Sequence, residues 1–163
     1  QAGLMLRSRW YKLGYACVNF GTPVSVRAWS AARGVDFDHL PKEQRQAEVA
    51  ALGHHLMQQV GALIPVLPVP LVATVLLRDP FRGWSIFELK AAVGELVQRL
   101  EAGGARLYLP RGDWDYAIEA GLRMLTLRRL VEVQDGLHRP RPGEEAVIRY
   151  YANSIAHLAG AAG

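Results

Sequence analysis

Residues 149–157 have the sequence RYYANSIAH, and this stretch decides how the end of the chain folds. Its spacing predicts a closing α-helix, one face of which carries four side chains able to form hydrogen bonds: Tyr150, Asn153, Ser154 and His157. A helix that only packs on a core needs only an apolar stripe, and a polar group buried without a partner costs about 1–3 kcal/mol. The polar face therefore indicates either a satisfied hydrogen-bond network that docks the helix or a family signature.

Two further stretches stand out. Residues 12–26 read KLGYACVNFGTPVSV, in which 15–20 is a β-rich run, 21–23 a Gly-Thr-Pro turn and 24–26 its extension. This pattern predicts an edge or final strand of a sheet. Residues 64–77 read IPVLPVPLVATVLL, a run that predicts a helix buried in protein or lying against acyl chains.

Together, the three stretches resemble the C-terminal part of glycerol-3-phosphate acyltransferases of the bacterial and mitochondrial type. That family has a Tyr-Tyr-x-Asn-x-x-x-His helix, a Val-x-Phe-Gly-Glu-Pro turn after its last acyltransferase motif, and a Thr-Pro-x-x-Leu-Val-Ala-x-x-Leu-Leu helix. The stretches occur in the family's order, with Thr22 in the place of the Glu, and cover most of residues 12–157. The residues that match as a structural signature are Phe20, Gly21, Pro23, Tyr150, Tyr151, Asn153 and His157.

The resemblance implies a parent enzyme that transfers a fatty acyl group from acyl-carrier protein (acyl-ACP) or coenzyme A (acyl-CoA) to glycerol 3-phosphate, which opens phospholipid synthesis. Enzymes of the family use His-x-x-x-x-Asp, in which the His is the general base and the Asp orients it. Five places after the five histidines of this chain stand Gln44, Gln59, Val60, Gly143 and Ala162. The family's glycine-rich and arginine-rich phosphate-binding motifs are absent as well. We therefore predict no catalytic, cofactor-binding or metal-binding residue here.

The ends of the sequence lead to a related expectation. The chain begins with Gln1 rather than Met, and it ends in Ala-Gly-Ala-Ala-Gly, in the middle of a helix by the family pattern. We expect a C-terminal fragment of a longer bacterial enzyme, inactive by itself.

Charge is distributed unevenly along the chain. The formal net charge is +4; residues 1–84 hold nine basic and five acidic residues, whereas residues 85–163 hold ten of each. A basic first half suits an anionic membrane surface or an acidic substrate, and it equally suits ordinary solvated arginines. With the resemblance, we expect a peripheral protein on the cytoplasmic face of the cell membrane. The apolar run at 63–77 is too short and too interrupted by proline to span a bilayer.

The remaining pattern predicts an α+β fold that is mostly α-helical, in two domains. Residues 1–80 would be the end of the acyltransferase domain, with the remnant edge strand and wall helices, and residues 81–163 a small winged-helix-like subdomain. Ser85 to Glu88 form a capping box, and Asp135-Gly136 predicts a type I′ hairpin. The helices expected are 3–12, 27–33, 41–63, 71–77, 86–102, 114–127 and 142–157, with short strands at 106–109, 130–133 and 137–139.

The winged-helix pattern supports an alternative, a nucleic-acid-binding regulator with a recognition helix at 113–127 and a wing at 130–139. DNA affinity comes mostly from phosphate neutralisation by Lys and Arg, and this half has no net charge. Asp113, Asp115 and Glu119 would also place negative charge where base contacts begin. We therefore expect no nucleic-acid partner.

A second alternative is a membrane-surface adaptor without chemistry. The apolar helix at 71–77 beside Arg78 and Arg82 favours it. The same helix lacks the polar face that an interfacial helix needs, which argues against it.

Overall fold

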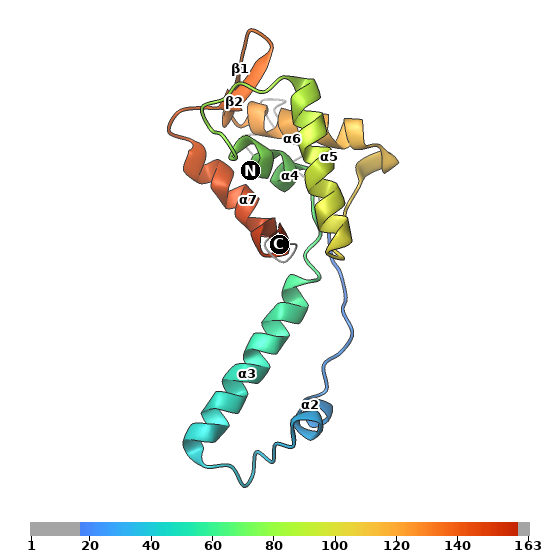
Figure 1. The fold of residues 1–163 in the computed structure, drawn as a ribbon, viewed down its shortest axis with the longest axis vertical. Helices are drawn as coiled ribbons and strands as arrows, with labels where there is room; N and C mark the ends of the chain where they lie inside the picture. Colours follow the sequence, from blue (N-terminus) through green and yellow to red (C-terminus); the bar gives the residue numbers. More distant parts are fainter. Residues whose placement is uncertain (1–16, 160–163) are drawn as a thin grey trace, which may run out of the picture.

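The computed structural model describes residues 17–159, so the helix tail expected at 3–12 lies outside the described residues. Helices predominate over one small sheet, which confirms the mostly helical α+β prediction. In Figure 1, α4 to α7 and the hairpin form one body, from which α3 projects with α2 beside its outer half. The elements are α2 (Val26–Arg33), α3 (Lys42–Gly61), α4 (Pro68–Leu76), α5 (Ile86–Ala102), the 3₁₀ turn η1 (Pro110–Gly112), α6 (Trp114–Leu127), β1 (Val131–Gln134), β2 (Leu137–Pro140) and α7 (Glu145–Ala159).

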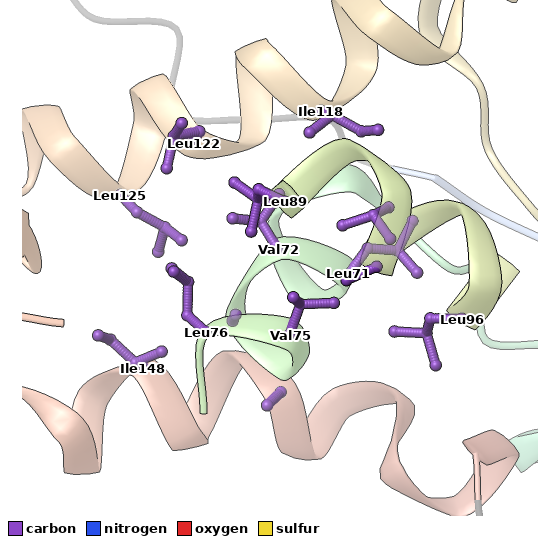
Figure 2. Packing of buried hydrophobic residues seen from close by; sticks show 14 of the residues in the cluster. Leu71, Val72, Val75, Leu76, Leu89, Leu96, Ile118, Leu122, Leu125 and Ile148 are labelled. Atoms are coloured by element: carbon purple, nitrogen blue, oxygen red, sulfur yellow. The ribbon is translucent and has the colours of Figure 1, made fainter. Parts of the chain in front are cut away.

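Helix α4 is the centre of the core. Seven of its nine residues are buried, which confirms that the apolar helix packs inside the protein. Figure 2 shows α4 between α6, which contributes Leu122, and α7, which contributes Ile148, with Leu89 of α5 packing from a third side. Each such side chain contributes about 1.5–3 kcal/mol when it leaves water. An uncharged helix is thus enclosed by three amphipathic ones.

The start of α4 differs from the prediction by a few residues. The helix was expected to follow Pro70, but it begins at Pro68 and includes both prolines in its first turn. Proline is tolerated there because the first N–H groups of a helix have no partner within the helix.

The capping box of α5 is confirmed. The Ser85 hydroxyl accepts a hydrogen bond from the Glu88 backbone N–H at 3.2 Å, and the Glu88 carboxylate accepts one from the Ser85 backbone N–H at 2.9 Å. The Ser85 backbone N–H, the Ser85 hydroxyl and the Arg82 guanidinium all donate to the Glu88 carboxylate and hold its pKa below the ordinary value. The start of α5 is therefore fixed by its own side chains.

The predicted hairpin is also confirmed. Asp135 and Gly136 have φ angles of 52° and 76°, as a type I′ turn requires, and Val131 pairs with Pro140 across the antiparallel strands. A backbone bridge between Trp84 and His138 ties the hairpin to the segment before α5. The strand expected at 106–109 is reduced to a single parallel bridge between Leu107 and Val66.

The edge strand expected at 15–20 and 24–26 is wrong for the residues that the structure describes. Residues 17–25 have no regular structure, and Val26 begins α2, with the Ser25 hydroxyl accepting a hydrogen bond from the Ala28 N–H at 3.2 Å. A β-rich run becomes a strand only beside another strand, and within residues 17–159 none lies next to it. An N-cap serine favours a helix instead.

The domain boundary predicted at residue 80 falls in the turn after α4. Because α4 packs against α5, α6 and α7, the core joins a helix from before this boundary to helices after it. The division at residue 80 stays a prediction. Within residues 17–159, the structure contains no helix with enough length and apolar character to traverse a bilayer.

Leu76→Ala is the direct test of this core. Leu76 is fully buried, so the substitution should lower the free energy of unfolding by about 2–5 kcal/mol through lost burial and a cavity. The matched control is Leu56→Ala on α3, where the leucine is exposed and the change should stay within about 0.5 kcal/mol. Urea denaturation followed by circular dichroism measures both. Equal losses in the two variants would contradict the assignment of α4 as the core.

Candidate functional site

An apolar cavity of about 240 Å³ lies between the first turn of α4, the middle of α6 and α7. Pro68 and Pro70 form one wall, Met124 another, and Arg128 and Tyr151 supply polar groups at its edge. Apolar cavities with a few placed polar groups are the usual form of small-molecule sites. This cavity is the candidate functional site.

Gly121 sets the width of the cavity. A Cβ at this position would lie 2.8 Å from the carbonyl oxygen of Pro68, so a larger residue would push α6 away from α4. Glycine inside a helix costs about 1 kcal/mol relative to alanine, and here it permits the close approach of two helices.

A contact between Arg128 and Tyr151 joins α6 to α7 at the edge of the cavity. The Arg128 guanidinium donates a hydrogen bond to the Tyr151 hydroxyl and lies 5.5 Å from the centre of its ring. Arg128 is the C-cap of α6, where the helix dipole favours a positive charge. The cavity therefore has an exposed cation beside an apolar interior.

The signature residues on α7 lie mostly outside the core. Ile148, Ala152 and Ile155 form the buried stripe of this helix, whereas Tyr150 is 75% exposed and Asn153 is also exposed. A buried polar network that docks the helix is therefore wrong for most of this face. The apolar stripe takes the side that faces α4, which leaves the polar groups toward solvent.

His157 is the part of this face that contacts the earlier half of the chain. Its Nε2–H donates a hydrogen bond to the carbonyl oxygen of Gly61, at the end of α3, with a distance of 2.9 Å. A Cβ on Gly61 would lie 3.3 Å from the imidazole ring, so glycine suits the close packing.

One signature residue from the start of the chain, Gly21, approaches the same junction between α3 and α4, as does the neighbouring Asn19. A Cβ on Gly21 would lie 2.7 Å from Cδ1 of Leu63, and the Asn19 side chain donates a hydrogen bond to the Leu63 carbonyl at 2.8 Å. Phe20, 87% exposed, and Pro23 lie on the surface. The structure thus brings Gly21 and His157, far apart in sequence, to residues 61–63, while the role of the signature stays a prediction.

A second polar feature lies under the hairpin. Nε1 of Trp84 and Nδ1 of His138 are buried, and neither has a hydrogen-bond partner within residues 17–159. Burial disfavours the charged imidazolium and lowers the pKa of His138. The guanidinium of Arg82 lies 4.3 Å from the centre of the Trp84 ring. In the same residues, no group of three or more His, Cys, Asp or Glu side chains could hold a metal ion.

The comparison with protein families decides the identity of the chain. The family model for the glycerol-3-phosphate acyltransferase C-terminal region matches residues 3–161. The chain belongs to this family. The resemblance seen in the sequence is thereby confirmed, and the protein is related to glycerol-3-phosphate acyltransferases. Searches of curated proteins and of solved structures found no match.

Sequence reasoning missed the cavity of this acyltransferase C-terminal region. The prolines at 68 and 70 were interpreted only as interruptions of an apolar run, and Arg128 was given no role. One signal was available: Gly121 stands inside the apolar stripe of a predicted helix, which often marks close backbone approach. The partner of that approach, the Pro68 carbonyl, could not be identified from the sequence.

His157→Leu tests the junction between α7 and α3. Losing the hydrogen bond to Gly61 should lower the free energy of unfolding by about 1 kcal/mol. Asn153→Leu, on the same helix but exposed, is the control and should change it by less than about 0.5 kcal/mol. Thermal melts of both variants measure this. The same melting temperature for His157→Leu and the unmodified chain would show that the contact contributes nothing.

The lowered pKa of His138 predicts a pH-dependent stability. An unfolded histidine titrates near pH 6.5, so as pH falls below about 6.5 the unfolded chain binds a proton that the folded chain resists, and stability falls. Above that pH both states are neutral and this contribution is fully present. Urea midpoints between pH 5 and 8 should decline toward low pH, and less steeply in His138→Gln. An unchanged slope in His138→Gln would contradict the assignment.

Proposed function

We propose that this chain is the non-catalytic C-terminal module of a longer glycerol-3-phosphate acyltransferase. The whole enzyme transfers a fatty acyl group from acyl-ACP or acyl-CoA to glycerol 3-phosphate. The match of the family model to residues 3–161 is the observation that carries this proposal. The chain's five histidines, each without an Asp five places later, support a catalytic His-x-x-x-x-Asp elsewhere in the protein.

The projecting helix α3, called the arm below, supports a contact with the catalytic part of the same enzyme. Residues 49–61 of α3 contain no Lys, Arg, Asp or Glu, and Val49, Met57 and Val60 are all more than half exposed. Charge depletion with exposed apolar side chains is typical of the centre of a protein interface. The outer half of α3 differs, because Glu48 forms a two-bond ion pair there with Arg33 of α2. The uncharged half of α3 would therefore be the interface.

A peripheral position on the cytoplasmic face of the cell membrane is part of the proposal. Its support is the excess of basic residues in the first half of the chain, nine against five acidic ones within residues 1–84. Such an excess attracts anionic lipid head groups.

An acyl-transfer assay tests the proposal. The protein translated from the complete reading frame should form 1-acylglycerol 3-phosphate from radiolabelled glycerol 3-phosphate with palmitoyl-CoA or palmitoyl-ACP. The 163-residue chain alone should form none. Dihydroxyacetone phosphate is the alternative acceptor to include. Product from the chain alone, or a reading frame that starts at the codon of Gln1, would contradict the proposal.

Two matched variants of the complete enzyme test the arm. Met57→Glu places a charge on the uncharged half of α3 and should lower turnover, whereas Gln46→Glu adds the same charge on the outer half and should leave it unchanged. Neither should alter the melt of the 163-residue chain, since both positions are exposed. Unchanged turnover in both variants would show that α3 is not the contact.

A further inference from the structure

We propose that the cavity between α4, α6 and α7 binds a single acyl chain that carries an anionic head group, with Arg128 contacting the head. The inference deepens the proposed function, on which the choice of ligand rests. The cavity itself is defined by geometry, independently of that choice.

The first turn of α4, which forms one wall of the cavity, is unusually apolar for the start of a helix. A helix N-terminus normally presents several unpaired N–H groups. Here Pro68 and Pro70 have no N–H, and the N–H of Leu71 donates to the Leu67 carbonyl at 3.4 Å. Val69 is thus the remaining donor of this turn. Such a wall suits hydrocarbon better than water or a polar ligand.

The other walls and the size lead to the same ligand class. Met124 of α6, whose side chain adapts readily to its surroundings, lines the cavity. The Ser154 hydroxyl of α7 also lines it, but this hydroxyl already donates a hydrogen bond to the Tyr151 carbonyl at 2.8 Å. A cavity of about 150 Å³ lined by apolar side chains stays dry and can hold benzene. The volume of about 240 Å³ therefore accommodates a segment of an acyl chain, and the rest of the chain would leave through the open side.

Charge complementarity selects the head group. The Arg128 guanidinium is exposed, lines the cavity and is oriented by its hydrogen bond to the Tyr151 hydroxyl. An arginine in this position pairs with a carboxylate or a phosphate. Two molecules share this chemistry: a free fatty acid and a 1-acylglycerol 3-phosphate, which is the product of the proposed reaction.

Calorimetric titration of the 163-residue chain with three probes, all below their micellar concentrations, tests the proposal. Oleate and 1-oleoylglycerol 3-phosphate carry an anion, and 1-monooleoylglycerol carries none. We expect at least one anionic probe to bind about tenfold more tightly than the neutral one, as expected for one charge-assisted contact. The tighter of the two anions identifies the source. The proposal would be overturned if the neutral probe bound as tightly as both anions, or if no probe bound at all.

Variants locate the site. Ala120→Phe fills the cavity and should abolish oleate binding, and Arg128→Gln should weaken it about tenfold. Arg128→Lys keeps the charge without the planar fork of arginine and should therefore restore only part of the binding. Arg123→Gln, an exposed arginine earlier on α6, is the matched control and should bind as the unmodified chain does. Circular dichroism confirms the fold of each variant. Full oleate binding by a folded Ala120→Phe would overturn the site.

The other possible occupant is a second copy of the chain. The proposal is overturned in favour of self-association if the chain forms a dimer, if Ala120→Phe disrupts that dimer, and if oleate does not compete with dimer formation. The titration needs no turnover, so a negative result here leaves the acyl-transfer assay intact. Likewise, failure of acyl transfer in the complete enzyme does not remove oleate binding by the chain.

Discussion

The fold depends on the burial of α4, a helix without a polar side. Leu71, Val72, Val75 and Leu76 leave no side of this helix that water could solvate, so the helix is stable only when it is enclosed. The stripes of α5, α6 and α7 supply that enclosure from three directions (Figure 2). Because every neighbour packs on the same short helix, the position of α4 fixes the distances between the others. The cavity at its first turn is a consequence of this arrangement, since Gly121 brings α6 against the Pro68 carbonyl.

The junction at residues 61–63 links this body to the arm. His157 of α7 donates to the Gly61 carbonyl, and Asn19 donates to the Leu63 carbonyl, so two distant parts of the chain contact the end of α3. Backbone carbonyls near a helix C-terminus lack partners within the helix, which makes them suitable acceptors for side chains from elsewhere. These contacts hold the end of α3 against the body formed by α4 to α7.

Local signals were strong where one element contains both partners of an interaction. The Ser85–Glu88 capping box and the Asp135-Gly136 turn each satisfy their own backbone, so the sequence predicted them correctly. The β-rich run at 15–20 failed over its described part, because a strand needs a second strand as partner. The polar face of α7 failed for a related reason: its spacing showed that the groups share a face, but it could not show which face points toward α4.

By itself, the sequence determined the family, the helical class and most helix boundaries, because capping residues, proline, glycine and apolar spacing act within a few residues of one another. The tertiary structure alone decided what lies between the helices. The pairing of Arg128 with Tyr151, the contact of His157 with Gly61 and the apolar cavity beside Pro68 all join residues from different elements. Such contacts depend on how whole helices pack, and no local pattern of residues encodes a distance between two surfaces that meet only after folding.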